Sequence, residues 1–382
     1  MREQVIYSSK KRNVSIDALR VLAMLFIVIW HSTNHGGLDA LSYGLTPFNS
    51  IVHLIQAFTC VSVNVYVLIS GYFLCTQVFR PSRLLKIIVQ VLFYSWVLFI
   101  ICYKINPSLF SAKDYLHFAL PISYRLNWFV TTYIGLYLLS PALNFLIKNL
   151  GQKRHLAFLV LLILSTSVWH DLLPSSFGLD VYDGKRLSWF IVLYFIAAYI
   201  RLYVNAEKLK TRRYFAIYIL SCISIWIIWA MTQFAIQRGA PAEASNYMGK
   251  YFYMYSSSFV LLSSICLFIG FLGLNWKGRK LMNKTIFAIA PLTLGVYLIH
   301  DNYIFREFIW GGMKSMASIN VGSLLICLLY CIGVFVTCII IDSMRNKLFG
   351  ILYKTNFWKS ISDWVDTLPQ RTYSVIEKLI LS

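Results

Sequence analysis

The sequence carries little charge for its length. Only 13% of its 382 residues are Asp, Glu, Lys or Arg, whereas 58% are hydrophobic, and the mean hydropathy is +0.65. Soluble domains carry about 25% charged residues, so this composition excludes an ordinary soluble globular protein. It indicates an all-α fold, a polytopic membrane helical bundle.

Several motifs of metal and hydrolase sites are also missing. The eight cysteines form no CxxC pair and lie in or beside apolar segments, which favours small buried side chains over a disulfide framework or a zinc site. His31 and His35 have the i,i+4 spacing of metal ligands, but no HExxH motif or obvious third ligand accompanies them. No GxSxG elbow surrounds Ser70, so a serine nucleophile is not expected there. We expect neither a metal nor a bound cofactor.

Long apolar runs replace the missing charge. A spanning helix requires about 20 mainly apolar residues, and ten segments meet this requirement. They cover residues 16–35, 50–74, 84–104, 127–147, 155–171, 187–204, 214–236, 253–274, 285–307 and 320–342. The sequence therefore predicts about ten transmembrane helices in a domain over residues 1–345. Residues 346–382 are predicted to form a cytoplasmic tail, either a solvated segment or an interfacial helix that Pro369 should interrupt.

Acidic residues are scarce, with 15 Asp and Glu against 35 Lys and Arg and a formal net charge of +20. On the ten-helix topology, 25 basic residues fall on the side of both termini and nine on the opposite side, with Arg20 inside the first helix. The positive-inside rule then places both termini in the cytoplasm. Because topology accounts for the charge, we expect no nucleic-acid partner.

Three polar side chains interrupt the first apolar segment. Arg20 and His31 are eleven residues apart, about 20° beyond three full turns, so they share a face and lie ~16 Å apart along the axis. Asp17 precedes Arg20 by three residues and can pair with it. Ionisable residues within a membrane usually face a cavity and serve a function. The alternatives are an interfacial ion pair for Asp17 and Arg20, and a structural role for His31.

The spacing of this cation and imidazole matches an acyl-coenzyme A, which has phosphates at one end and a thioester at the end of a long arm. With the N-terminus inside, Arg20 lies near the cytoplasmic end of the helix and His31 beyond its middle. Arg20 is therefore a candidate for binding donor phosphate. His31 is a candidate general base toward an acceptor hydroxyl, or a transient acyl carrier.

Other candidates occur at matching depths. His300 is expected ~22 Å from the cytoplasmic end of the ninth segment, as His31 is in the first, and could share acid and base roles with it; the alternative is a hydrogen bond to a neighbouring backbone. Ser70 is expected near the level of Arg20. Trp128 and Tyr133 lie toward the outer face, where aromatic rings can stack on a sugar, although anchoring at the interface is the commoner use.

Four stretches resemble the acyltransferase-3 family of bacterial membrane acyltransferases. The segment DALRVLAMLFIVIWH contains the Arg and His, separated by ten residues, that mark the first helix of the family, and Arg20 and His31 match them. The other stretches are VNVYVLISGYFL at 63–74, LNWFVTTYIGLYLLSPALN at 126–144 and LGVYLIHDNYIF at 294–305. Together they extend over nearly the whole chain.

The resemblance implies a multi-pass protein of the bacterial cell membrane that is surrounded by membrane lipids. It implies acetyl-CoA as donor substrate and a cell-surface glycan, or its lipid-linked precursor, as acceptor. The predicted function is membrane O-acetyltransferase. The alternative is an exporter or flippase for a polysaccharide or lipid-linked glycan, although the paired Gly or Pro interruptions typical of transporters are not evident. The resemblance specifies neither the acceptor sugar and its acylated position nor the acyl group. It leaves open the choice between direct transfer and an acyl-enzyme, the oligomeric state and the need for a partner protein.

Overall fold

The computed structural model describes residues 12–38, 44–172, 182–242, 249–316 and 320–381, and within these ranges the regular structure is entirely helical. The first half contains α1 (Val14–His35), α3 (Pro47–Thr59), α4 (Ser62–Leu74), α5 (Pro81–Ile105), α6 (Ala112–Ala119), α7 (Trp128–Ile163), a π-helical turn (Leu164–Val168) and α8 (Trp169–Leu172). The second half contains α9 (Leu187–Tyr203), α10 (Thr211–Gln237), α12 (Ser258–Leu272), α13 (Lys280–Ile289), α14 (Thr293–His300), α15 (Phe305–Met316), α16 (Val321–Leu352) and α17 (Asn356–Leu381).

The chain is a polytopic helical membrane protein, as the composition predicts. Seven helical segments within the described residues are long and apolar enough to cross a membrane, counting α3 with α4 and α13 with α14 as single spans. The helices α9 and α12 are apolar but shorter. The long α7 covers two predicted spans and contains a non-helical residue, Gly151, at φ 67° and ψ 169°. Each of the ten predicted segments thus corresponds to one helix, to two consecutive helices or to half of α7.

The second predicted span is broken in the structure. The helix stops at Thr59 and restarts at Ser62, because hydroxyl and thiol groups compete for backbone carbonyls at this point. Thr59 Oγ1 donates to the carbonyl of Ile55 at 2.8 Å, Cys60 Sγ lies 3.2 Å from the carbonyl of Ala57, and Ser62 Oγ donates to the carbonyl of Thr59. The break makes room for a cavity against α1.

The ninth and tenth predicted spans have the wrong ends. The ninth is interrupted by the 3₁₀ turn Ala290–Leu292, which contains Pro291, and stops at His300 rather than 307. Asn302 then starts α15, because its Oδ1 accepts a hydrogen bond from the backbone N–H of Phe305 at 3.2 Å. The tenth helix continues to Leu352, so the predicted boundary after residue 345 falls inside α16.

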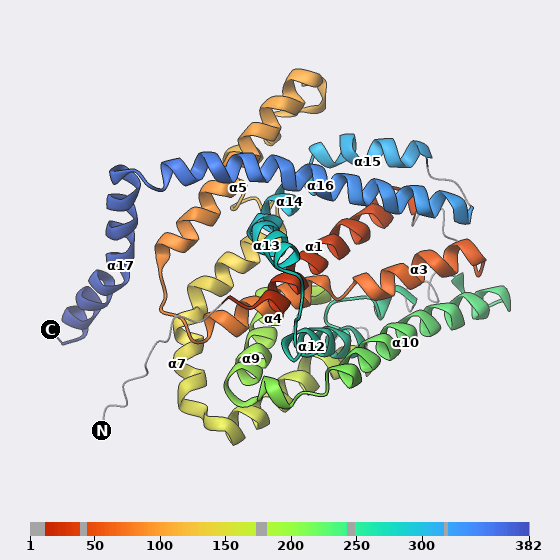
Figure 1. Cartoon of the computed structure of the whole chain (residues 1–382), viewed down its shortest axis with the longest axis horizontal. Helices are drawn as coiled ribbons and strands as arrows, with labels where there is room; N and C mark the ends of the chain where they lie inside the picture. The colour runs from red at the N-terminus through yellow and green to blue at the C-terminus, as the bar shows by residue number, and fades with distance from the viewer. Residues whose placement is uncertain (1–11, 39–43, 173–181, 243–248, 317–319, 382) are drawn as a thin grey trace.

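The first helix lies at the middle of the bundle. Figure 1 shows α1 crossing the centre, with α16 on one side and α12 and α10 on the other. The helices that contact α1 are α3, α4, α12, α13, α14, α15 and α16. Polar groups on α1 are therefore presented to neighbouring helices and not only to lipid.

The start of α1 meets the end of α12, and the start of α5 meets α17. Ser15 Oγ donates to the carbonyl of Leu274 at 3.2 Å. The Asp366 carboxylate accepts from Ser82 N at 2.8 Å and from Ser82 Oγ at 2.9 Å, which caps α5. The helix α17 runs through Pro369, which was expected to interrupt it. That this end faces the cytoplasm stays a prediction.

A buried ion pair on α16 contacts residues of α5 and α14. Asp342 on α16 is fully buried, and Arg345, one turn later, donates to both its oxygens at 2.8 Å. Tyr94 on α5 donates to Asp342 Oδ1 at 2.7 Å, and Gln90 does so at 3.3 Å. On α14, Gly295 packs so closely against Asp342 that a Cβ there would overlap the carboxyl group. The pair therefore determines how near α14 lies to α16.

The ion pair allows a test of stability. Asp342→Ala leaves the Arg345 guanidinium buried without its partner, which costs about 3–5 kcal/mol in soluble proteins. The double variant Asp342→Ala with Arg345→Leu removes both charges and is expected to unfold at a higher temperature than the single variant. The measurement is thermal unfolding in detergent. A double variant no more stable than Asp342→Ala would show that the stranded charge is not the cause.

Candidate functional site

A cavity of about 270 Å³ extends along α1 from Arg20 to His31. The walls come from α1, the break between α3 and α4, the start of α7, the 3₁₀ turn with Pro291, and α14. The remaining lining residues are Met24, Ile27, Trp30, Thr59, Cys60, Ser62, Val63, Tyr66, Ser70, Ile87, Trp128, Phe129, Val130, Tyr133, Tyr255, Ala290, Pro291, Thr293, Leu294 and Tyr297. Most of this surface is apolar or aromatic, with polar groups at the two ends.

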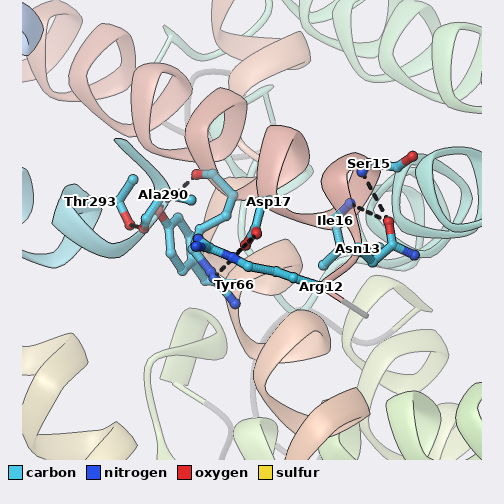
Figure 2. A network of polar contacts seen from close by, with 9 residues as sticks. Arg12, Asn13, Ser15, Ile16, Asp17, Tyr66, Ala290 and Thr293 are labelled. Carbon is cyan, nitrogen blue, oxygen red and sulfur yellow. Dashed lines mark hydrogen bonds and ion pairs between the residues drawn. The ribbon is translucent and has the colours of Figure 1, made fainter. Parts of the chain in front are cut away.

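At one end of the cavity the carboxylate of Asp17 holds the Arg20 side chain. Asp17 Oδ1 accepts from Arg20 Nη1 at 2.9 Å, and Asp17 Oδ2 accepts from Arg12 Nε at 2.5 Å. Figure 2 shows Asp17 beside Arg12, with Tyr66 nearby. The Tyr66 hydroxyl donates to the Arg20 carbonyl at 2.8 Å. Asp17, predicted to bind substrate, does not line the cavity; it is buried and orients the guanidinium that does.

The start of α1 is itself well defined, which fixes Arg20 two turns later. The Asn13 side chain accepts hydrogen bonds from the backbone N–H groups of Ser15 at 2.9 Å and Ile16 at 3.3 Å, as Figure 2 shows. This is the N-cap geometry that satisfies the first free donors of a helix. Across the cavity, Thr293 Oγ1 donates to the Ala290 carbonyl at 3.0 Å in the turn that begins α14.

The other end of the cavity contains a chain of hydrogen bonds through two imidazoles. His300 Nδ1 lies 2.6 Å from the carbonyl of Val296, so it must be the protonated donor nitrogen. In neutral His300 the other nitrogen, Nε2, is then an acceptor, and His31 Nδ1 lies 2.9 Å from it. The network assigns the proton of neutral His31 to Nδ1. Nε2 of His31 keeps its lone pair, which can accept a proton or attack a carbonyl.

Asp301 is the site residue that sequence analysis missed. A helix that continued past His300 would turn Asp301 away from His31, but α14 ends at His300 and Asp301 has a non-helical conformation. Asp301 is only 8% exposed, and its Oδ1 lies 3.7 Å from His31 Nδ1 and 3.5 Å from His35 Nε2. Arg306 Nη1 lies 3.8 Å from the same oxygen. A positive charge that develops on His31 would therefore be stabilised by a nearby carboxylate.

The structure brings most of the predicted site residues to one cavity. Ser70, Trp128 and Tyr133 line it together with Arg20 and His31. Trp128 stacks on Tyr255 with ring centroids 6.2 Å apart and an interplanar angle of 20°. The tryptophan thus belongs to the cavity wall and is not only an interface anchor. His300 lies behind His31, outside the lining.

The described residues contain no group of three or more His, Cys, Asp or Glu side chains placed to hold a metal ion. His31 and His35 contact each other edge to face, with ring centroids 5.6 Å apart. All eight cysteines are free thiols.

A family model described as an acyltransferase domain, Acyl_transf_3, matches residues 13–342. The chain belongs to this acyltransferase family. The match confirms the resemblance drawn from the sequence and covers the whole cavity of the acyltransferase. No curated protein and no solved structure matches the chain.

The hydrogen-bond chain gives a sharp prediction for His31 of the acyltransferase. His31→Ala is expected to leave at most about one per cent of acyl transfer, since general-base catalysis contributes roughly 10²–10⁴-fold. His31→Gln should fail too, because an amide cannot take up the proton. His35→Ala is the matched control, since it also contacts Asp301 but does not line the cavity, and should retain most activity. The measurement is the O-acyl content of the cell envelope at matched protein levels. If His31→Gln kept near-normal activity while His35→Ala was inactive, the catalytic histidine would be His35 and not His31.

Proposed function

We propose that this membrane acyltransferase is an O-acetyltransferase. It takes acetyl-CoA from the cytoplasm and acetylates a hydroxyl of a cell-surface polysaccharide or its lipid-linked precursor in the bacterial cell membrane. The single observation that supports this most is one cavity lined by both Arg20 and His31. Arg20 suits the donor phosphates, and the pantetheine arm would place the thioester near the imidazole ~16 Å along the helix.

The proposed reaction uses the lone pair of His31 Nε2. The acceptor hydroxyl gives its proton to Nε2 while its oxygen attacks the thioester carbonyl carbon. The C–S bond then breaks, and the coenzyme A sulfur takes the proton from the imidazolium, leaving an O-acetyl ester and free thiol. His300 and Asp301 hold the ring and face the developing positive charge. In an acyl-enzyme route the same nitrogen would carry the acetyl group first.

The size of the cavity favours an enzyme over an exporter. A volume of about 270 Å³ is just below the roughly 300–1,000 Å³ of small-molecule sites, and the wall of the cavity is mostly apolar. A passage for a hydrated polysaccharide would need a far larger polar channel. The cavity is suited instead to the arm of a thioester donor.

The proposed function is tested by NMR of the cell-surface glycan from cells with and without the gene. Loss of O-acetyl signals, restored by the wild-type gene and not by His31→Ala, is the expected result. If the glycan is lost from the surface while the glycan retained inside the cell is still O-acetylated, the result would instead indicate export. An unchanged spectrum would contradict both functions.

Arg20 gives a second test. Arg20→Lys keeps the charge but loses the planar fork that suits phosphate. We expect the KM for acetyl-CoA to rise about tenfold, as for loss of a hydrogen bond to a charged group, while the enzyme still inserts. Arg201→Lys is the matched control, because Arg201 donates to the Tyr72 hydroxyl at 2.9 Å and does not line the cavity. Equal KM values for wild type and Arg20→Lys would mean that Arg20 serves only the ion pair with Asp17 and does not bind the donor.

A further inference from the structure

A second cavity, the outer pocket, adjoins the first at its His31 end. It has a volume of about 200 Å³ and shares two wall residues, Trp30 and Tyr255, with the main cavity. The other residues that line the outer pocket are Asn34, His53, Gln56, Asp183, Lys185, Lys250, Tyr253 and Met254. Asn34 lies one turn beyond Trp30 on α1, away from Arg20, so the outer pocket lies on the far side of the reacting imidazole.

The outer pocket differs chemically from the main cavity. Its wall combines aromatic rings with amide, carboxylate and ammonium groups, whereas the main cavity is largely apolar. Trp30 and Tyr253 lie with ring centroids 6.5 Å apart and an interplanar angle of 33°. The Gln56 amide is fixed by donating to Thr33 Oγ1 at 2.9 Å. Aromatic faces together with fixed donors and acceptors suit a sugar ring, which has apolar C–H faces and a rim of hydroxyls.

Asp183 is held in this pocket by an unusual backbone. Its φ of 56° is in the left-handed region, which Asp and Asn tolerate better than other side chains. The next residue, Gly184, also has a positive φ, and a Cβ there would lie 2.5 Å from that of Tyr255. The Asp183 carbonyl accepts from Tyr255 N at 3.2 Å. Such strained residues cluster at functional sites.

The Asp183 carboxylate makes no ion pair or hydrogen bond with the described residues, so its oxygens are available to a ligand. We propose that the outer pocket binds a pyranose unit of the acceptor glycan and that Asp183 accepts hydrogen bonds from its hydroxyls. The sugar would enter from the side opposite the donor and present one hydroxyl past Trp30 to His31. This proposal rests on the proposed O-acetyltransferase function and assigns it an acceptor site.

The test measures KM for each substrate separately, in detergent-solubilised membranes, which expose both sides of the protein, with acetyl-CoA as donor. The acceptor probe is de-O-acetylated surface polysaccharide from the same cells, and the readout is acetyl transferred to it. Asp183→Gly keeps the left-handed turn and removes the carboxylate. We expect the KM for the polysaccharide to rise about tenfold or more, as for loss of a hydrogen bond to a charged group, with the KM for acetyl-CoA unchanged. Asp183→Asn keeps the turn and one acceptor oxygen and should fall between Asp183→Gly and wild type.

Arg125→Gly is the matched control, because Arg125 is the other described non-glycine residue with positive φ and lines neither cavity. It should behave as wild type. If Asp183→Gly keeps a normal KM for the polysaccharide, or raises only that for acetyl-CoA, the assignment of the outer pocket is wrong. If wild type transfers no acetyl group to the polysaccharide, the proposed function fails instead, so the two failures are distinguishable.

The direction in which the outer pocket opens provides an independent check. Asn34→Cys is expected to react with a membrane-impermeant maleimide on intact cells. The wild-type protein gives the background, and it should be low because seven of the eight native thiols are buried. If Asn34→Cys is labelled only in inverted vesicles, the pocket opens to the cytoplasm and the proposal is wrong.

Discussion

The hydrogen bond between His31 and His300 is the interaction on which the site depends. It joins α1, which also carries Arg20, to the last residue of α14, so the position of that helix sets the position of the second imidazole. Because Gly295 packs directly against Asp342, the ion pair on α16 limits where α14 can lie. A charged pair that is not part of the cavity lining thus helps to set where the imidazole of His300 meets His31.

The membrane explains why these polar groups come in clusters. No water is available in the hydrocarbon core, so buried polar atoms must find partners within the protein. In the Asp342 cluster the carboxylate accepts from Arg345 and Tyr94, and it is closed to any ligand. In the histidine chain every step is paired except the last nitrogen, His31 Nε2, which belongs to a cavity-lining side chain. That difference separates the structural Asp342 cluster from the histidine chain to which we assign the reaction.

Sequence reasoning succeeded where a helix is continuous and failed where one breaks. The common face of Arg20 and His31 follows from helical periodicity, and α1 is unbroken from residue 14 to 35. Asp301 could not be placed in the same way, because extending the helix past His300 turns its side chain away from His31. The turn depends on Asn302 starting a new helix, a competition between local hydrogen bonds that hydropathy does not report. The break at Cys60, which opens the cavity, has the same origin.

The arrangement of polar and apolar walls also bears on the competition between transfer and hydrolysis. A thioester beside an unprotonated imidazole is exposed to attack by water, so an acyltransferase must favour the acceptor hydroxyl. Met24, Ile27 and Phe129 line the main cavity, the proposed donor side, and their side chains offer water no hydrogen bonds. The polar groups of the outer pocket lie beyond Trp30 and Tyr255, where the proposed acceptor, with several hydroxyls, would bind more strongly than a water molecule. The boundary between the two walls therefore falls beside His31, the proposed general base, where the proposed reaction would choose its nucleophile.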